Sequence, residues 1–133
     1  MSIREEALDW WSEANHNLRQ ARKNLEIEEY SVASFLAHQA AEKAVKALLY
    51  SVNEAPWGHS IRILLERYFE RVGGGDESLL ERARELDRHY IPSRYPNVHP
   101  AGAAHEAYDE ATSINAIRCS EAILSYAIKA IEG

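Results

Sequence analysis

The sequence predicts an all-α protein, an antiparallel up-and-down four-helix bundle with a shorter fifth helix. Apolar residues recur at helical spacing over most of the chain, and no useful stretch alternates with a period of two. Glycine and proline are confined to a few positions between these helical stretches. Helices joined by short connections favour antiparallel packing around one core.

The length and the net charge of the chain limit the kind of protein that it can be. The chain has 133 residues, so we expect one domain spanning 1–133, with a core that needs no disulfide or structural metal. Its only cysteine, Cys119, has no internal partner, and no apolar run resembles a signal peptide or a membrane span. We therefore expect a cytoplasmic protein. The net charge of −6 argues against a general nucleic-acid binder but leaves room for a local basic pocket.

The first two helices are expected at 2–24 and 30–52. Ser2 and Glu5 have the spacing of a capping box, which predicts where the first helix begins. The second helix carries a narrow stripe, mostly of alanine, formed by Tyr30, Ala33, Ala37, Ala40, Ala44 and Leu48. Small residues on a buried face let a neighbouring helix approach closely. The polar residues expected to point away from this stripe are Gln39, Glu42, Lys43 and Lys46.

Three further helices are expected at 60–72, 77–90 and 109–131. Three consecutive glycines end the first of these, because glycine suits the left-handed residue that follows a helix. Asp76 is a good N-cap for the next helix, and Asp109 is expected to open the last one.

The connection 91–104 is the long non-helical segment, and we expect the rest of the chain to be its scaffold. It contains three prolines, and it holds Arg94 and His99. A histidine can move protons in RNA cleavage without metal, and an arginine can hold the phosphate. The ordinary alternative is an arginine paired with a helix end and a solvated histidine, which spacing alone favours.

A small phosphate-binding patch is the second candidate. Arg84 and Arg88 share one helix face just before Arg94, and Arg82 and His89 make this the most basic stretch of the chain. The alternative, which we favour on composition, is a solvated face balanced by the acidic residues between them. The expected phosphate- or nucleotide-binding residues are Arg84, Arg88, Arg94 and Tyr95.

Candidate metal pairs lead to no metal site, and we expect no cofactor. Glu13 and His16 have E-x-x-H spacing, but a di-iron bundle needs a second such motif, which the chain lacks. Two further pairs have i,i+4 ligand spacing, His38 with Glu42 and His105 with Asp109. Each lacks an evident third ligand, and His38 is expected on the polar side of its helix, so these are interpreted as surface residues.

Four more side chains have two interpretations each. His59 either caps or packs against the start of the helix at 60–72, which we favour, or faces a cleft. Trp10, Trp11 and Trp57 could stack on bases, but at helical spacing such residues more often form a core or a dimer interface.

Three ordered motifs resemble those of HEPN domains (higher eukaryotes and prokaryotes nucleotide-binding). Residues 33–48, ASFLAHQAAEKAVKAL, resemble the signature A-x-F-x-x-Q-x-A-E-K-A-x-K-A-L. Gly58-His59-Ser60-Ile61 follows at the start of the next helix, and residues 90–96, YIPSRYP, resemble the short R-Y-P branch of the family.

The resemblance implies a helical homodimer with a cleft between the subunits, often paired with a minimal nucleotidyltransferase as a toxin–antitoxin module. The HEPN member of such a pair is a metal-independent endoribonuclease, whose motif is arginine, four to six residues, then histidine. Arg94 and His99 match that spacing. Tyr95 and the neighbouring prolines depart from the usual motif, and Ala101 occupies the place of a tyrosine that is modified with AMP in some of these toxins.

The resulting hypothesis is a toxin-type or accessory partner of a minimal nucleotidyltransferase that cleaves RNA without metal. In it, His99 is the general acid/base and Arg94 binds the phosphate. Two alternatives remain: a non-catalytic nucleotide- or partner-binding module, and a purely structural dimer that stabilises its partner.

Overall fold

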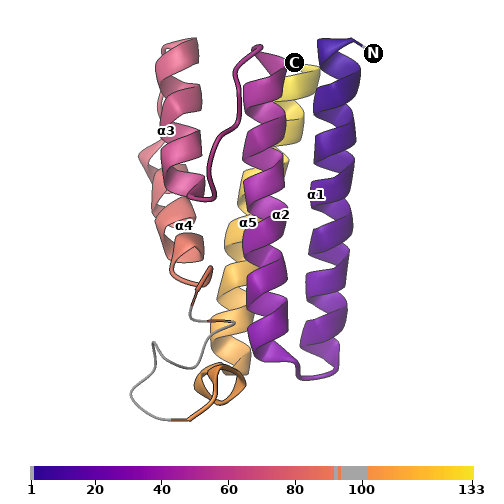
Figure 1. Cartoon of the computed structure of the whole chain (residues 1–133), viewed down its shortest axis with the longest axis vertical. Helices are drawn as coiled ribbons and strands as arrows, with labels where there is room; N and C mark the ends of the chain where they lie inside the picture. Colours follow the sequence, from indigo (N-terminus) through magenta and orange to yellow (C-terminus); the bar gives the residue numbers. More distant parts are fainter. Residues whose placement is uncertain (1, 92, 94–101) are drawn as a thin grey trace.

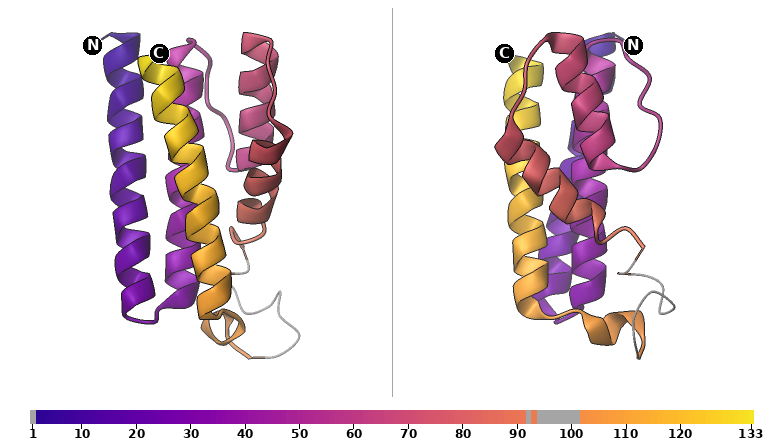
Figure 2. Two further views of the ribbon diagram at one scale, coloured as in Figure 1. Left: turned by 180° about the vertical axis from the view of Figure 1, so that it is seen from behind. Right: turned by 90° about the vertical axis from the view of Figure 1, so that its left-hand side faces the viewer.

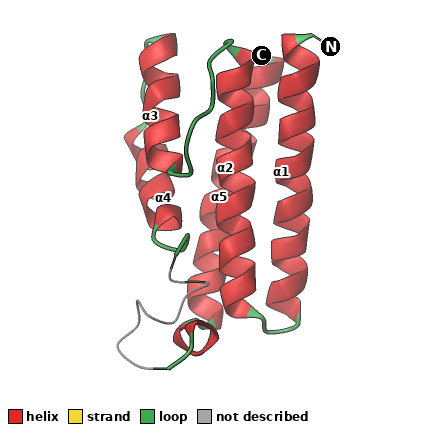
Figure 3. Cartoon of the chain, in the orientation of Figure 1, coloured by secondary structure: helices red, strands yellow, loops and turns green. Residues whose placement is uncertain are grey.

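The computed structural model describes residues 2–91, 93 and 102–133, and in these residues it is helical, without a strand (Figure 3). Three α-helices are long and two are short: α1 (Ile3–Glu26), α2 (Tyr30–Ser51) and α5 (Glu110–Glu132), against α3 (Ile61–Val72) and α4 (Glu77–Asp87). A short 3₁₀ helix, η2 (Ala104–Ala107), precedes α5. The all-helical prediction is confirmed.

The three long helices lie side by side and form the body of the molecule (Figure 1). The alanine stripe of α2 makes this possible, since Ala33, Ala37, Ala40 and Ala44 are all fully buried. Polar bonds add to the packing. Trp11 Nε1 donates to the Leu124 carbonyl at 3.1 Å and thereby joins α1 to α5.

The shorter helices α3 and α4 pack on the side of the body formed by α2 and α5 (Figure 2). Their ends are set by local chemistry. The Asp76 side chain accepts from the Leu79 amide at 3.0 Å and caps α4, as predicted. Gly73 ends α3 with φ +76°, a left-handed conformation that glycine adopts without strain.

Helix α4 ends at Asp87, earlier than the expected residue 90. The chain tightens there, because the Tyr90 amide bonds to the Asp87 carbonyl at 3.3 Å, three residues back instead of four. Ile91 precedes Pro92, and a residue before proline disfavours helical geometry.

Two polar residues of α2 that were expected on the outside are buried. His38 is completely inaccessible and Glu42 is 4% exposed. The expectation was wrong because α3 and α4 pack against α2, and polar partners come from other segments: Asp87 at the end of α4 for His38, and His59 in the connection before α3 for Glu42.

The described helices include none that is both long enough and apolar enough to cross a bilayer.

Candidate functional site

Buried polar groups gather where α2, α3 and α4 meet, directly before the 91–104 connection. His38 contributes both ring nitrogens, with Nε2 3.3 Å from Asp87 Oδ1 and Nδ1 3.2 Å from Gln39 Nε2. The Gln39 amide nitrogen can only donate, so Nδ1 accepts and Nε2–H donates to Asp87. Both ring nitrogens of His38 are therefore in use.

Asp87 links α4 to the first turn of α3. Its Oδ1 also accepts from the Ile61 amide at 2.8 Å, and its Oδ2 accepts from Ser60 Oγ at 2.9 Å and the Arg62 amide at 3.1 Å. Burial opposes ionisation of this carboxyl, but the bonds from His38, the two amides and Ser60 outweigh burial and lower its pKa. With four donors in place, Asp87 is an anchor for the start of α3 and has no oxygen left for a ligand.

Glu42 and His59 form a second pair on the same side of α2. His59 Nδ1 lies 3.2 Å from Glu42 Oε1, and Lys46 Nζ lies 3.1 Å from Glu42 Oε2. The His59 ring also stacks on Tyr90, with ring centroids 5.1 Å apart and an interplanar angle of 16°.

A hollow of about 200 Å³ opens beside this pair. Its lining residues are His59, Ser60, Asp87, Tyr90 and Ile91. The His59 ring therefore packs against Tyr90 and also lines a concave surface.

His89 and Tyr108 join the two ends of the long connection. His89 Nδ1 is 2.9 Å from the Tyr108 hydroxyl, and the Ser93 hydroxyl donates to the His89 carbonyl. Burial lowers the pKa of His89 and raises that of Tyr108 to about 12, so both groups are uncharged at neutral pH.

The chain matches a known protein family over almost its whole length. A family model, the HEPN domain, matches residues 7–131. The chain belongs to the HEPN domain family. No curated protein matches the chain.

Several solved structures share this fold. TT1696 from Thermus thermophilus is 41% identical, with a TM-score of 0.89, covering 93% of this chain and 97% of that one. ST0689, described as an archaeal HEPN homologue, is 37% identical, with a TM-score of 0.80 and coverages of 94% and 97%. The HEPN domain protein tm0613 from Thermotoga maritima is 26% identical, with a TM-score of 0.73 and coverages of 91% and 95%.

The structure describes only some of the site residues that the sequence predicted for this HEPN domain. Arg94, Tyr95 and His99 lie outside the described residues. Arg84 pairs with Glu77 at 2.9 Å and with Glu81 at 3.1 Å. Arg88 directly follows α4, is exposed and pairs with Glu85 of that helix.

The candidate metal pairs of the HEPN domain do not assemble into a site. Glu13, His16 and His105 are exposed, and Asp109 caps α5 by accepting from the Thr112 amide at 2.8 Å. Within the described ranges, histidine, cysteine and acidic side chains nowhere gather in threes in a way that could hold a metal ion.

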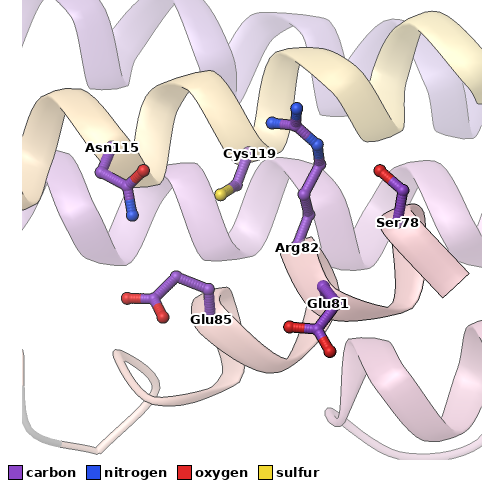
Figure 4. Close-up of a pocket in the computed structure, with 6 residues that line it drawn as sticks. All are labelled: Ser78, Glu81, Arg82, Glu85, Asn115 and Cys119. Atoms are coloured by element: carbon purple, nitrogen blue, oxygen red, sulfur yellow. The ribbon is translucent and has the colours of Figure 1, made fainter.

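A larger hollow, of about 360 Å³, lies between α4 and α5 (Figure 4). Its lining residues are Ser78, Glu81, Arg82, Glu85, Asn115 and Cys119. Burial raises the pKa of the Cys119 thiol above its usual range, so the thiol stays protonated and is a poor nucleophile. Two carboxylates beside one arginine also make a poor site for phosphate.

Sequence reasoning missed the Glu42–His59 pair and the His38–Asp87 network. His38 and Glu42 had been interpreted as surface residues, and His59 had been left with two interpretations. The useful signal was their shared helix face together with a histidine at the start of the next helix. The partner residues lie 17 and 49 positions away, so only the fold brings them together.

Proposed function

We propose that this HEPN-domain protein is a metal-independent endoribonuclease that acts as the toxin-type or accessory partner of a minimal nucleotidyltransferase. Arg94 binds the scissile phosphate and stabilises the charge that develops in the transition state. His99 acts as a general acid/base, since an imidazole exchanges protons near neutral pH.

The observation that carries this proposal is the bond between His89 and Tyr108. It closes the base of the segment that contains Arg94 and His99, and both bonded residues belong to the described, partly buried part of the fold. Ser93, directly before Arg94, is buried and bonded to the His89 carbonyl. A loop fixed at both ends is the arrangement expected of a functional loop on a rigid scaffold.

The second candidate is a non-catalytic nucleotide- or partner-binding module. It is favoured by the hollow of about 200 Å³ beside Tyr90, because an aromatic ring next to a concave surface suits a nucleobase. Arg84 and Arg88 would then bind phosphate only by exchanging their present glutamate partners. Tyr95 and Arg94 would bind the nucleotide without chemistry.

The proposal also includes the domain organisation and the oligomeric state. We propose that 1–133 forms a single domain, an antiparallel up-and-down four-helix bundle with a shorter fifth helix, and that two copies form a homodimer in the cytoplasm. Large exposed apolar side chains supply surface for such contacts: Ile3, Ile27, Val32, Trp57, Ile63, Val72 and Ile91. Light scattering after gel filtration gives the molar mass that tests the dimer.

Cleavage of a labelled oligoribonucleotide in the presence of EDTA tests the nuclease. Wild type should cleave, Arg94→Ala and His99→Ala should each lose about 10²-fold or more, and the α1 surface variant His16→Ala should behave as wild type. Equal rates for wild type, Arg94→Ala and His99→Ala would exclude the catalytic assignment. RNA binding that depends on Arg94 without any cleavage would favour the second candidate.

A further inference from the structure

We propose that a groove at the end of the body where α1 begins and α2 ends (Figure 1) binds a proline-rich segment of a partner protein. The segment lies there as an extended polyproline II helix and carries a basic residue beside its prolines. The groove shares no residue with the nuclease site proposed above, so either activity can exist without the other.

Two hollows that share Trp10 form this groove. The first, of about 270 Å³, is lined by Trp10, Lys46, Tyr50, Ala55, Pro56 and Trp57. The second, of about 250 Å³, is lined by Asp9, Trp10, Glu13 and Lys43. Together these residues are the aromatic groove. In it, the Trp10 and Tyr50 rings stack, with centroids 5.5 Å apart and an interplanar angle of 24°.

Trp57 is the open wall of the aromatic groove. It is 77% exposed, more than any other large apolar residue that the structure describes. Its main chain is nevertheless fixed, because the Arg67 guanidinium donates to the carbonyls of Ala55 and Trp57. A tryptophan on a fixed backbone loses little freedom when a partner binds, and tryptophan is enriched among the residues that dominate binding energy at interfaces.

The rings of the aromatic groove offer hydrogen-bond donors that are not in use. Trp10 Nε1, Trp57 Nε1 and the Tyr50 hydroxyl make no hydrogen bond to any other residue in the described part of the chain. An indole N–H can only donate, so these groups need acceptors. A proline residue has a carbonyl and no N–H, so a proline-rich segment supplies acceptors without leaving donors of its own unpaired.

The length of the aromatic groove fits this ligand. Lys43, Lys46 and Tyr50 share one face of α2, and the helix rises about 10 Å from Lys43 to Tyr50. In a polyproline II helix, two prolines with two residues between them are about 9 Å apart. Such a pair can therefore occupy both hollows at once.

Charge selects a basic residue beside the prolines. Asp9 and Glu13 lie one turn apart on α1, and neither forms an ion pair with a described residue. Lys46 is balanced by Glu42 at 3.1 Å, so Lys43 is the one cation of the groove that faces these two carboxylates without a partner of its own among the described residues. A guanidinium or ammonium group is therefore attracted to this end, whereas the phosphates of RNA are repelled.

Fluorescence anisotropy with labelled synthetic peptides tests the class of ligand. The peptides have a P-x-x-P core with an arginine before or after it, and matched peptides carry alanine for both prolines or glutamate for the arginine. At least one arginine peptide should bind, and its alanine and glutamate counterparts should bind about 10-fold more weakly or worse. Failure of every peptide to bind at about 1 mM would overturn the proposal.

Variants of the groove test its location. Trp57→Ala should weaken binding about 10-fold or more, and its thermal unfolding should match wild type because the side chain is exposed. Ile27→Ala removes another exposed apolar side chain, at the far end of α1, and should bind as wild type does. Wild-type affinity in Trp57→Ala would overturn the assignment to this groove.

A matched pair of charge changes on α1 tests the basic residue. Glu13→Gln should lower the affinity for the arginine peptides about threefold, because one attractive carboxylate is lost. Glu26→Gln makes the same change in net charge at an exposed position at the other end of α1 and should have no effect. Equal effects of the two changes would mean that no carboxylate of the groove recognises the arginine.

The indole N–H groups give an independent measurement by NMR of ¹⁵N-labelled protein. Titration with a binding peptide should shift the indole resonances of Trp10 and Trp57, which are free to donate. The resonance of Trp11 should shift much less, because its Nε1 already donates to the Leu124 carbonyl. Equal shifts of all three, or none in Trp10 and Trp57, would overturn the proposed contacts.

Two other occupants would be recognised by the same variants. Binding of a single-stranded oligoribonucleotide that depends on Trp57, without binding of any peptide, would make the groove a nucleic-acid site. A lower molar mass of Trp57→Ala in light scattering, again without peptide binding by wild type, would mean that a second copy of the chain covers the groove. Either result would overturn the proposal.

Discussion

His89 Nδ1 and the Tyr108 hydroxyl lie 2.9 Å apart, and their bond joins the chain just before the 91–104 connection to the chain just after it. The two rings also meet edge to face, with centroids 5.4 Å apart. In the described part of the fold, His89 Nε2 is buried without a partner. Among these residues, the bond to Tyr108 is therefore the one that gives a ring nitrogen of His89 a hydrogen-bond partner.

Tyr108→Phe should destabilise the fold and reduce any RNA cleavage. Removing the hydroxyl leaves His89 Nδ1 buried and unpaired, which costs about 1–3 kcal/mol in the free energy of unfolding. Urea unfolding measures the loss. Tyr30→Phe is the matched control, because the Tyr30 hydroxyl is an exposed contact 3.5 Å from Glu110, and it should change stability by less than about 0.5 kcal/mol.

His89 should make stability depend on pH below 6.5. Burial is the largest cause that lowers the pKa of His89 in the fold, Glu85 opposes it with a smaller effect, and the charge of Arg88 lowers the pKa further. The unfolded chain then binds a proton more readily than the folded chain, so stability is complete above the ordinary value of 6.5 and is lost as the pH falls through the lower, folded pKa.

Urea unfolding at several pH values between about 7 and 5 checks this dependence. Wild type should lose stability towards pH 5, and His89→Gln should show a flatter profile, whatever its stability at pH 7. His16→Ala, which removes an exposed histidine, should keep the wild-type slope. Parallel profiles for wild type and His89→Gln would contradict the prediction.

Asp87→Asn should weaken the junction of α3 and α4. Asparagine cannot accept from all four donors as a carboxylate does, and hydrogen bonds to charged groups are strong, so we expect a loss of about 2 kcal/mol or more at pH 7. The folded pKa of Asp87 is lowered, so its contribution is present above the ordinary value of 3.8 and is lost as the pH falls through the folded pKa.

The measurement for Asp87 is unfolding at pH 7 and under acid. Wild type and Asp87→Asn should converge in stability as the pH falls below 3.8, whereas Asp9→Asn, an exposed change on α1, should match wild type throughout. A constant difference between wild type and Asp87→Asn down to low pH would mean that ionisation of Asp87 plays no part.

Ala40→Leu should be destabilising although leucine is a good helix former. Ala40 is fully buried in the α2 stripe, and overpacking such a site costs about 1–3 kcal/mol. Ala130→Leu, at an exposed position of α5, should stay within about 0.5 kcal/mol of wild type. Thermal unfolding followed by circular dichroism compares the two, and equal midpoints would show that the stripe tolerates larger side chains.

The helices were predicted well because capping residues and helical spacing act over only a few neighbouring residues. Ser2, Asp76 and Asp109 each accept from a backbone amide three residues later, as their capping patterns indicated. The alanine stripe is buried as expected, since helical spacing alone decides which residues share a face. The end of α4 was placed too late, because the tight turn at Asp87 overrides a continuing helical pattern.

The candidate site was predicted less completely. Arg94, Tyr95 and His99 were chosen from spacing and resemblance, and they stay predictions because they fall outside the described residues. Arg84 lies on α4 and Arg88 directly follows its last residue, and their glutamate partners depend on side-chain rotamers that a motif does not specify.

By itself, the sequence determined an all-helical HEPN domain, the ends of most helices and the alanine face on which the long helices meet. Only the tertiary structure decided that His38 and Glu42 are buried and that His59 pairs with Glu42 while stacking on Tyr90. The reason is physical. A charged or polar side chain enters the interior only when another element supplies its partner, and these partners come from helices and turns far away along the chain.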